Sequence, residues 1–208
     1  MPSASPGQRL TRPSNGLKEF LWQLEGIGQG TLADFGAVSQ ATVMYFIEHR
    51  FKVYTEDLLA GWGAFLEREA AQASTVAPEN RPDSSPRARA ERFLASNLRY
   101  TPDSFDAVLL WDVLDYMDRE VARLFLTRVL SLMREGGVLL GVFHTKAPEQ
   151  FYRYRVLDAQ NLELVPAAAL VPHNHIYQNR EIQDLFERFR SSKMFVSRDQ
   201  VREGVFIK

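Results

Sequence analysis

The segment from residue 31 to residue 57 constrains the fold most strongly, because its pattern predicts a strand, a tight turn, a helix and a second strand in succession. Residues 32–35 form a short, mostly apolar run, and Gly36 provides the turn. Residues 40–49 carry apolar side chains at roughly helical spacing, and residues 51–55 are β-branched and aromatic. The segment therefore predicts a βαβ unit.

Acidic side chains lie at the ends of both predicted strands. Asp34 is near the end of the first strand, and Glu56 and Asp57 follow the second. In a βαβ unit, ligands bind at the carboxyl ends of the strands, and an acid that closes the second strand hydrogen-bonds a ribose diol. We therefore expect Asp57, with Glu56 as the second candidate, to contact a nucleoside.

Composition excludes several kinds of chemistry. The chain has 208 residues, enough for one domain with a substantial core, and a net charge of -1, which favours neither nucleic acid nor an anionic membrane as a partner. It has no cysteine, so disulfides, thiolate zinc sites and cysteine nucleophiles are excluded. Neither a signal peptide nor an apolar run of membrane-spanning length is found, so we expect a cytoplasmic protein.

The domain boundaries follow from local composition. Residues 1–16 are rich in Pro, Ser and Gly and predict a disordered lead-in, so the domain is expected to span 17–208. Residues 73–87 collect Pro, Ser, Asn and Asp and predict a flexible insert. Residues 151–170 predict a β-hairpin that caps the domain. Arg153 and Arg155 on one face of that hairpin would favour an anionic substrate, although a solvated face is the preferred explanation.

The second half of the chain repeats the alternation of strands and helices. Residues 105–111 (FDAVLLW) are a nearly continuous apolar run, typical of a buried parallel strand. An amphipathic helix is predicted over 119–134, with Asp118 as its N-cap. Further strands are predicted at 93–98, 138–143, 193–197 and 204–207, and a helix at 180–189.

Two passages together resemble the class I S-adenosylmethionine-dependent methyltransferases. The sequence Asp34-Phe35-Gly36-Ala37-Val38-Ser39-Gln40 is similar to the first motif of that family, and only its first glycine is present. The later passage, a strand ending in Asp112, an amphipathic helix, Gly136-Gly137 and an apolar strand, is similar to the second half of the family's domain. The resemblance implies a Rossmann-like α/β fold with a seven-stranded, mostly parallel sheet in the order 3-2-1-4-5-7-6.

The same resemblance implies S-adenosylmethionine as the cofactor and direct methyl transfer to an acceptor that the sequence does not identify. No dedicated catalytic base follows from it, and the weak candidates are Asp112 and His144. The implied cofactor contacts are Asp34, Gly36 and Ala37 at the methionine end, Glu56 and Asp57 at the ribose, Asn97 and Leu98 at the adenine, Trp111 as a cover and Asp112 at the cleft wall.

Three alternatives stay open at this point. Val38 and Gln40 stand where the family has glycines, so the domain could be a catalytically inactive scaffold whose pocket these side chains fill. A nicotinamide-dependent oxidoreductase is disfavoured because its glycine spacing is absent. His173 and His175 suggest a metal, but no acid or third histidine is spaced nearby to complete a site, so we expect none. Asp115 is expected to be a solvated turn residue.

Overall fold

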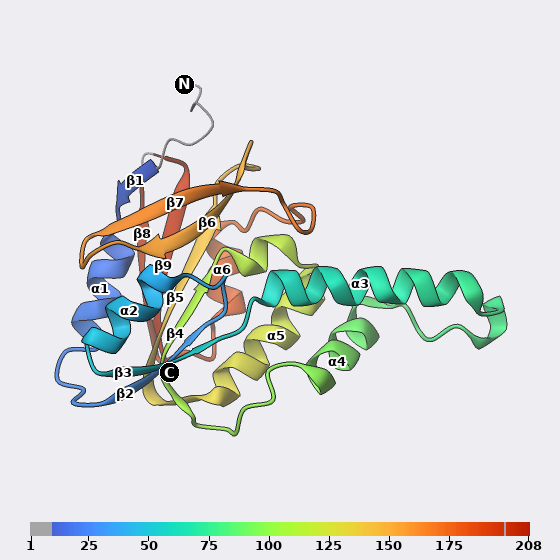
Figure 1. Ribbon diagram of the computed structural model, residues 1–208, viewed down its shortest axis with the longest axis horizontal. Helices are drawn as coiled ribbons and strands as arrows, with labels where there is room; N and C mark the ends of the chain where they lie inside the picture. Colours follow the sequence, from blue (N-terminus) through green and yellow to red (C-terminus); the bar gives the residue numbers. More distant parts are fainter. Residues whose placement is uncertain (1–9, 198) are drawn as a thin grey trace.

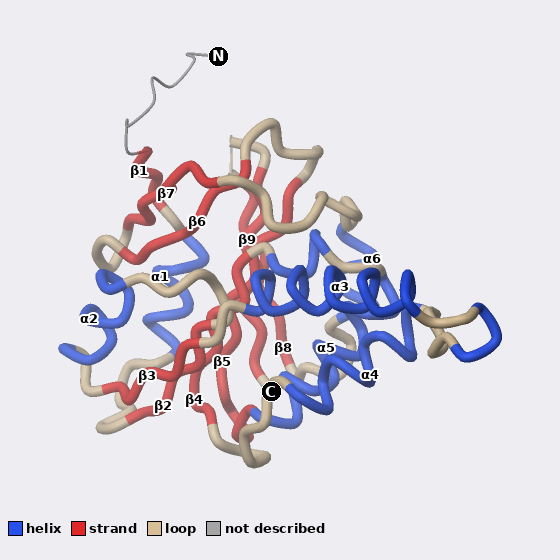
Figure 2. The backbone as a smooth tube through the Cα atoms, turned by 45° about the vertical axis from the view of Figure 1, so that its right-hand side comes forward, coloured by secondary structure: helices blue, strands red, loops and turns tan. Residues whose placement is uncertain are grey.

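The computed structural model describes residues 10–197 and 199–208, which form two sheets with helices around the larger one (Figures 1 and 2). The predicted lead-in over residues 1–9 lies outside the described residues. The elements are, in chain order, β1 (Leu10–Pro13), α1 (Asn15–Gln23), β2 (Gly30–Asp34), α2 (Gln40–Glu48), β3 (Phe51–Thr55), α3 (Leu58–Thr75), the 3-10 helix η1 (Pro78–Asn80), α4 (Pro86–Ser96), β4 (Phe105–Trp111), the 3-10 helix η2 (Val113–Tyr116), α5 (Arg119–Leu132), β5 (Met133–His144), β6 (Phe151–Val156), β7 (Asn161–Ala167), α6 (Asn179–Leu185), β8 (Ser191–Val196) and β9 (Val201–Ile207).

The larger sheet has the strand order β3-β2-β4-β5-β9-β8. The first four strands are parallel, and β9 runs antiparallel between β5 and β8. The order reverses at β2, which pairs with β3 on one side and β4 on the other, so their carboxyl ends form a topological switch point. This arrangement confirms the predicted Rossmann-like methyltransferase fold class.

The predicted third strand, at 93–98, is wrong, so the sheet has six strands among the described residues and the order 3-2-1-4-5-7-6 becomes 2-1-4-5-7-6 in the same numbering. Residues 93–96 are instead the end of α4. The Ser85 hydroxyl accepts a hydrogen bond from Ala88 N and caps that helix, and Pro86 occupies its first position. Both are signals for a helix start that override the apolar run which follows them.

The smaller sheet has the order β1-β7-β6 and lies over one face of the larger sheet (Figure 2). The antiparallel pairing of β6 with β7 confirms the predicted hairpin. The predicted disordered lead-in is wrong for its last residues, because Leu10–Pro13 pair with β7 and α1 begins at Asn15. The buried Arg12 guanidinium pairs with the Glu203 carboxylate on β9 and thereby ties β1 to the larger sheet.

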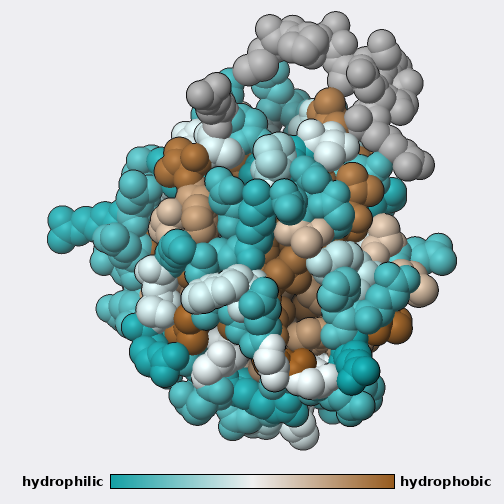
Figure 3. All heavy atoms as spheres, turned by 90° about the vertical axis from the view of Figure 1, so that its left-hand side faces the viewer, coloured by the Kyte–Doolittle hydropathy of each residue, from teal (hydrophilic) through white to brown (hydrophobic). Residues whose placement is uncertain are grey.

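The larger sheet is covered on both faces by apolar clusters. One cluster holds α3, α4, α5 and α6 against the sheet, and the other contains residues of α1, α2, β6 and β7. The α1 and α2 side presents a mostly hydrophilic surface with apolar groups along a furrow (Figure 3). No helix among the described residues is long and apolar enough to cross a membrane.

The predicted insert at 73–87 lies at the far end of α3, which extends beyond the sheet (Figure 1). It contains the last three residues of α3, the 3-10 helix η1 and an exposed loop that leads into α4. The Gly136-Gly137 pair was expected between the helix and a strand at 138–143, but it lies within β5, because α5 ends at Leu132 and β5 begins at Met133. Gly136 has φ +77°, a conformation that favours glycine.

Candidate functional site

The carboxyl ends of β2, β3 and β4 enclose a small cavity of about 20 Å³. Its lining includes the hairpin residues 151–154 and five residues at the strand ends: Gly36, Ala37, Asp57, Trp111 and Asp112. The fold therefore brings together the residues predicted for the methionine end, the ribose, the cover and the cleft wall. Its volume is close to that of one water molecule, whereas pockets for drug-sized ligands have about 300–1,000 Å³.

Trp111 fills the space at the switch point. Its indole Nε1 donates a hydrogen bond to Asp34 Oδ1 at 2.7 Å, and its ring stacks on Tyr154 of β6 at a centroid distance of 5.5 Å and an interplanar angle of 4°. Its backbone has φ +53°, which is an outlier for a bulky residue and marks a strained position at the end of β4. The side chain of Trp111 thus closes the crevice between β2 and β4.

Gly36 is required by the indole and not by a left-handed turn. A Cβ added at Gly36 would lie 2.3 Å from Trp111 Cδ1 and 2.7 Å from Nε1, distances that real Cβ atoms essentially never show. The glycine therefore permits the close approach of a side chain of this same protein, in the place where the sequence resemblance implies approach of a cofactor.

Asp34 is almost completely buried beneath the indole. It accepts hydrogen bonds from Trp111 Nε1 and from Gly36 N, the latter at 3.1 Å. Burial raises the pKa of Asp34 to about 6, because loss of hydration disfavours the carboxylate more than these two hydrogen bonds favour it. Asp34 therefore holds the closed position of Trp111.

The side chains of Val38 and Gln40 do not fill the crevice. Val38 is 64% exposed and Gln40 is also exposed, so both point away from the cavity. Ser39 between them is buried and accepts a hydrogen bond from Thr42 N as the N-cap of α2. The occlusion that the sequence suggested is present, but Trp111 and Tyr154 produce it.

The remaining predicted cofactor contacts are engaged elsewhere. Leu98 N donates to Glu56 Oε1 at 3.1 Å, and Asn97 Nδ2 donates to Phe93 O at the end of α4. Asp57, although it lines the cavity, also accepts a hydrogen bond from Ala60 N as the N-cap of α3. Their assignment to adenine and ribose stays a prediction.

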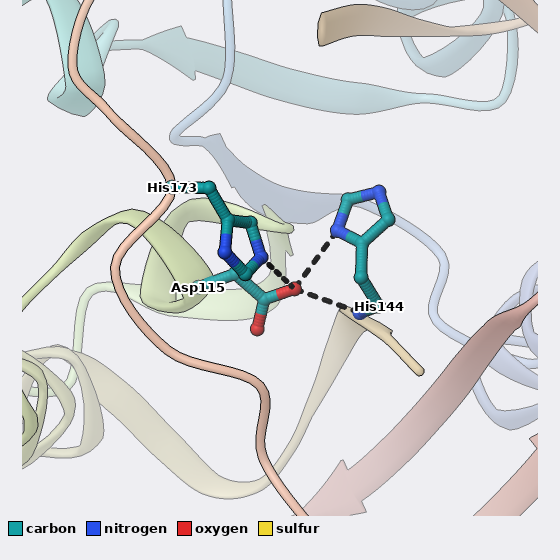
Figure 4. Close-up of side chains that lie close together, drawn as sticks. All are labelled: Asp115, His144 and His173. Atoms are coloured by element: carbon teal, nitrogen blue, oxygen red, sulfur yellow. Dashed lines mark hydrogen bonds and ion pairs between the residues drawn. The ribbon is translucent and has the colours of Figure 1, made fainter. Parts of the chain in front are cut away.

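A second polar cluster lies beside the cavity, at the carboxyl ends of β4 and β5 (Figure 4). The carboxylate Oδ2 of Asp115 accepts from the backbone N of His144 at 2.7 Å and lies 2.9 Å from its Nδ1. Asp112 Oδ2 lies 4.0 Å from the other ring nitrogen, Nε2. The expectation that Asp115 is solvated is wrong, because it is completely buried in η2.

These buried groups shift one another's protonation. Burial raises the pKa of Asp112 to about 7, and the nearby carboxylate of Asp115 acts in the same direction against the opposing effect of His144. Burial disfavours the imidazolium form of His144, but the carboxylates of Asp115 and Asp112 outweigh it and raise the pKa of His144.

His173 completes this cluster from the loop before α6. Its Nε2 lies 4.0 Å from Asp115 Oδ2, and one ligand atom each from Asp115, His144 and His173 lie within 4.8 Å of one another. The premise that no acid or further histidine joins His173 is therefore wrong: the fold supplies both, from positions 58 and 29 residues earlier. His175 points elsewhere and contacts Glu181.

A larger hollow of about 860 Å³ lies at the opposite end of β5. It is lined by the end of α5, the Glu135–Gly136 corner and the segment after α6. Because the predicted site residues are at the carboxyl ends of the parallel strands, where ligands bind in this fold class, the small closed cavity is the better candidate site.

Comparison with known proteins gives likenesses of fold alone. No protein-family model matches the chain, and no curated protein matches it. A putative zinc-dependent alcohol dehydrogenase from Rhodobacter sphaeroides is 11% identical, with a TM-score of 0.50 over 95% of this chain and 90% of that one. An S-adenosylmethionine-dependent methyltransferase from Mesorhizobium loti is 15% identical, with a TM-score of 0.49 over 91% and 96% of the two chains.

A third solved structure is 1,6-didemethyltoxoflavin-N1-methyltransferase from Burkholderia thailandensis, which has 1,6-didemethyltoxoflavin and S-adenosylhomocysteine bound. It is 16% identical, with a TM-score of 0.47 over 93% of this chain and 78% of that one. The order of the larger sheet and its antiparallel inner strand β9 are those of the resembling family without its third strand. The chain thus has the Rossmann-like fold of the class I methyltransferases.

Proposed function

We propose that this protein is an S-adenosylmethionine-dependent methyltransferase whose cofactor crevice is closed by Trp111 when no ligand is bound. One observation carries the proposal: Gly36, Ala37, Asp57 and Asp112 meet around Trp111 at the topological switch point. This is the place where open α/β sheets bind nucleotides. The methyl acceptor is not identified by these residues.

In the closed arrangement the cofactor does not fit, because the cavity is close in size to one water molecule. With the indole turned away, Asp57 would hold the ribose, and the Gly36–Ala37 corner would hold the methionine end. S-Adenosylmethionine would supply the methyl group. Asp112 would form the wall beside it, so the protein would contribute mainly proximity and orientation.

Opening the crevice has a definite cost. The Trp111–Asp34 hydrogen bond is worth about 1.5–3 kcal/mol when the carboxylate is charged, and the stack on Tyr154 about 0.5–1.5 kcal/mol. Cofactor binding must offset this loss, and each 1.4 kcal/mol lowers affinity about tenfold. A variant without the indole is therefore expected to bind more tightly than the natural chain.

The second candidate function is a catalytically inactive domain of the same fold. It is favoured because several polar groups predicted to contact the cofactor already have partners within the chain. Asp34 bonds Trp111, Asp57 caps α3, Asn97 bonds Phe93 O and Glu56 accepts from Leu98 N. In that case the closed crevice is the permanent state, and the domain serves as a binding partner or scaffold.

Isothermal titration with S-adenosylhomocysteine separates the two. The methyltransferase proposal predicts saturable 1:1 binding to the natural chain, tighter binding to Trp111→Ala and weaker binding to Asp57→Asn, which keeps a side-chain oxygen for the α3 cap. Trp22→Ala, at a residue 60% exposed on α1, is the matched control and should bind like the natural chain.

Two results would contradict the proposal. Absence of binding heat for both the natural chain and a folded Trp111→Ala variant, up to millimolar S-adenosylhomocysteine, would support the inactive domain. Binding by Trp111→Ala alone would mean that the crevice accepts a nucleoside but stays closed in the natural chain, which also favours the second function. Circular dichroism establishes that each variant is folded.

A further inference from the structure

We propose that Asp115, His144 and His173 bind a divalent first-row transition-metal ion such as Zn²⁺ or Fe²⁺, next to the crevice. Figure 4 shows the three side chains converging, with both imidazoles directed at one carboxylate oxygen. The proposal does not depend on methyl transfer, since it rests on these side chains alone.

The separations of the ligand atoms fit such an ion after small side-chain movements. Asp115 Oδ2 lies 2.9 Å from His144 Nδ1 and 4.0 Å from His173 Nε2, and all three atoms fall within 4.8 Å. Metal bonds of about 2.0–2.2 Å to nitrogen and oxygen, in tetrahedral geometry, place neighbouring ligand atoms about 3.3–3.6 Å apart. His173 must therefore move by roughly 1 Å, and it lies on a loop with its side chain 15% exposed.

The backbone fixes the three residues relative to one another. The carbonyl oxygen of Asp115 accepts hydrogen bonds from Asn174 N at 2.9 Å and from His175 N at 3.0 Å, so the loop that carries His173 is attached to the residue that carries the carboxylate. The backbone N of His144 donates to the same carboxylate and sets its orientation. The cluster is thus held in place before any ion binds.

Two buried polar atoms of the cluster lack a hydrogen-bond partner in the described part of the chain, and one of them, His173 Nε2, faces the Asp115 carboxylate. Asp115 Oδ1 and His173 Nε2 are buried and have no hydrogen-bond partner among the described residues. Asp115 is completely buried, and an unsatisfied carboxylate oxygen in such a place costs about 1–3 kcal/mol or more. A cation between the three side chains would accept a lone pair from His173 Nε2 and would bind Asp115 through Oδ2, which would offset the cost of burying that carboxylate.

The surroundings select the class of ion. Two imidazoles and one carboxylate suit Zn²⁺ and Fe²⁺, whereas Mg²⁺ and Ca²⁺ prefer oxygen ligands alone. Coordination through Nδ1 leaves His144 Nε2–H directed toward Asp112, whose carboxylate lies 4.0 Å away. Metal-bound histidines almost always donate their second N–H to such a partner.

The test uses the full chain without tag histidines, freed of metal by a chelator and then dialysed. Titration calorimetry with Zn²⁺ should give one site per chain, and Co²⁺ should give the visible absorption of a low-coordinate complex. His173→Ala should weaken Zn²⁺ binding at least tenfold, while His175→Ala, two residues away and bonded to Glu181, should leave it unchanged. Mg²⁺ should give no heat.

Thermal unfolding gives a second readout that does not need activity. Saturating Zn²⁺ should raise the melting temperature of the natural chain and of His175→Ala, because an ion that binds only the folded state stabilises it. It should not raise that of His173→Ala, which folds because residue 173 lies on a loop outside the helices and strands. The proposal is overturned if Zn²⁺ binding is absent, or if His173→Ala and His175→Ala bind it equally.

Discussion

The clearest quantitative prediction concerns Asp34, the buried carboxyl beneath the Trp111 indole. Burial raises its pKa from 3.8 to about 6, so the folded state favours the neutral acid. The stability that this neutral form contributes is fully present below pH 3.8 and is lost as the pH rises through about 6. Because each pKa unit corresponds to about 1.4 kcal/mol, ionisation of Asp34 costs about 3 kcal/mol.

Asp34→Asn removes this cost and keeps a side-chain oxygen for Trp111 Nε1 and Gly36 N. We expect the variant to exceed the natural chain in free energy of unfolding by an amount that grows with pH, by about 2 kcal/mol between about pH 4.5 and about pH 7.5. Urea unfolding at several pH values, followed by circular dichroism, measures the difference. Asp184→Asn, at an exposed position of α6, is the control and should show no such growth.

The reasoning would be refuted if the difference between Asp34→Asn and the natural chain were the same at both ends of this pH range. It would also be refuted if the variant were the less stable protein near pH 7.5. Either result would mean that the two hydrogen bonds favour the carboxylate as strongly as burial disfavours it.

Three further substitutions test the packing around the crevice by urea unfolding. Gly36→Ala places a methyl group 2.3 Å from Trp111 Cδ1 and should cost about 1–3 kcal/mol, whereas Gly28→Ala, with nothing within 4 Å, should not. Thr42→Val removes the hydroxyl that accepts a hydrogen bond from Val156 N at 3.0 Å and should cost about 1–3 kcal/mol of stability. Thr42→Ser keeps the hydroxyl and should retain most of that stability. Glu203→Leu leaves the buried Arg12 without its main partner and should cost about 3–5 kcal/mol of stability. Its control, Lys193→Ala, breaks the ion pair of an exposed lysine with Glu19 and should cost under about 1 kcal/mol. Equal losses in a variant and its control would contradict each argument.

Local patterns predicted most of the larger sheet. The apolar run that became β4, the N-cap Asp118 of α5 and the final strand pair all depend on neighbours in sequence, so the sequence alone specifies them. The strand expected at 93–98 failed because its apolar residues were given more weight than the helix start at Ser85 and Pro86. The short strand β1 could not be predicted, because it forms only by pairing with β7 about 150 residues later.

The sequence predicted where the candidate site lies but not that the Trp111 side chain closes it. Asp34, Gly36 and Asp57 lie near the switch point, as strand ends in a βαβ unit require. The closure by Trp111 depends on a stack with Tyr154 and a hydrogen bond to Asp34, both of which join distant segments. The meeting of Asp115, His144 and His173 likewise depends on the tertiary fold, and no spacing in the sequence signals it.

The most direct test of the central claim is fluorine NMR of the chain labelled with 5-fluorotryptophan and titrated with S-adenosylhomocysteine. The chain has three tryptophans, so three resonances are expected, and Trp22→Phe and Trp111→Phe assign them. If Trp111 opens to admit the ligand, its resonance shifts saturably while that of the exposed Trp22 stays fixed. If all three resonances remain unchanged up to millimolar ligand, the crevice does not open and the methyltransferase account is wrong.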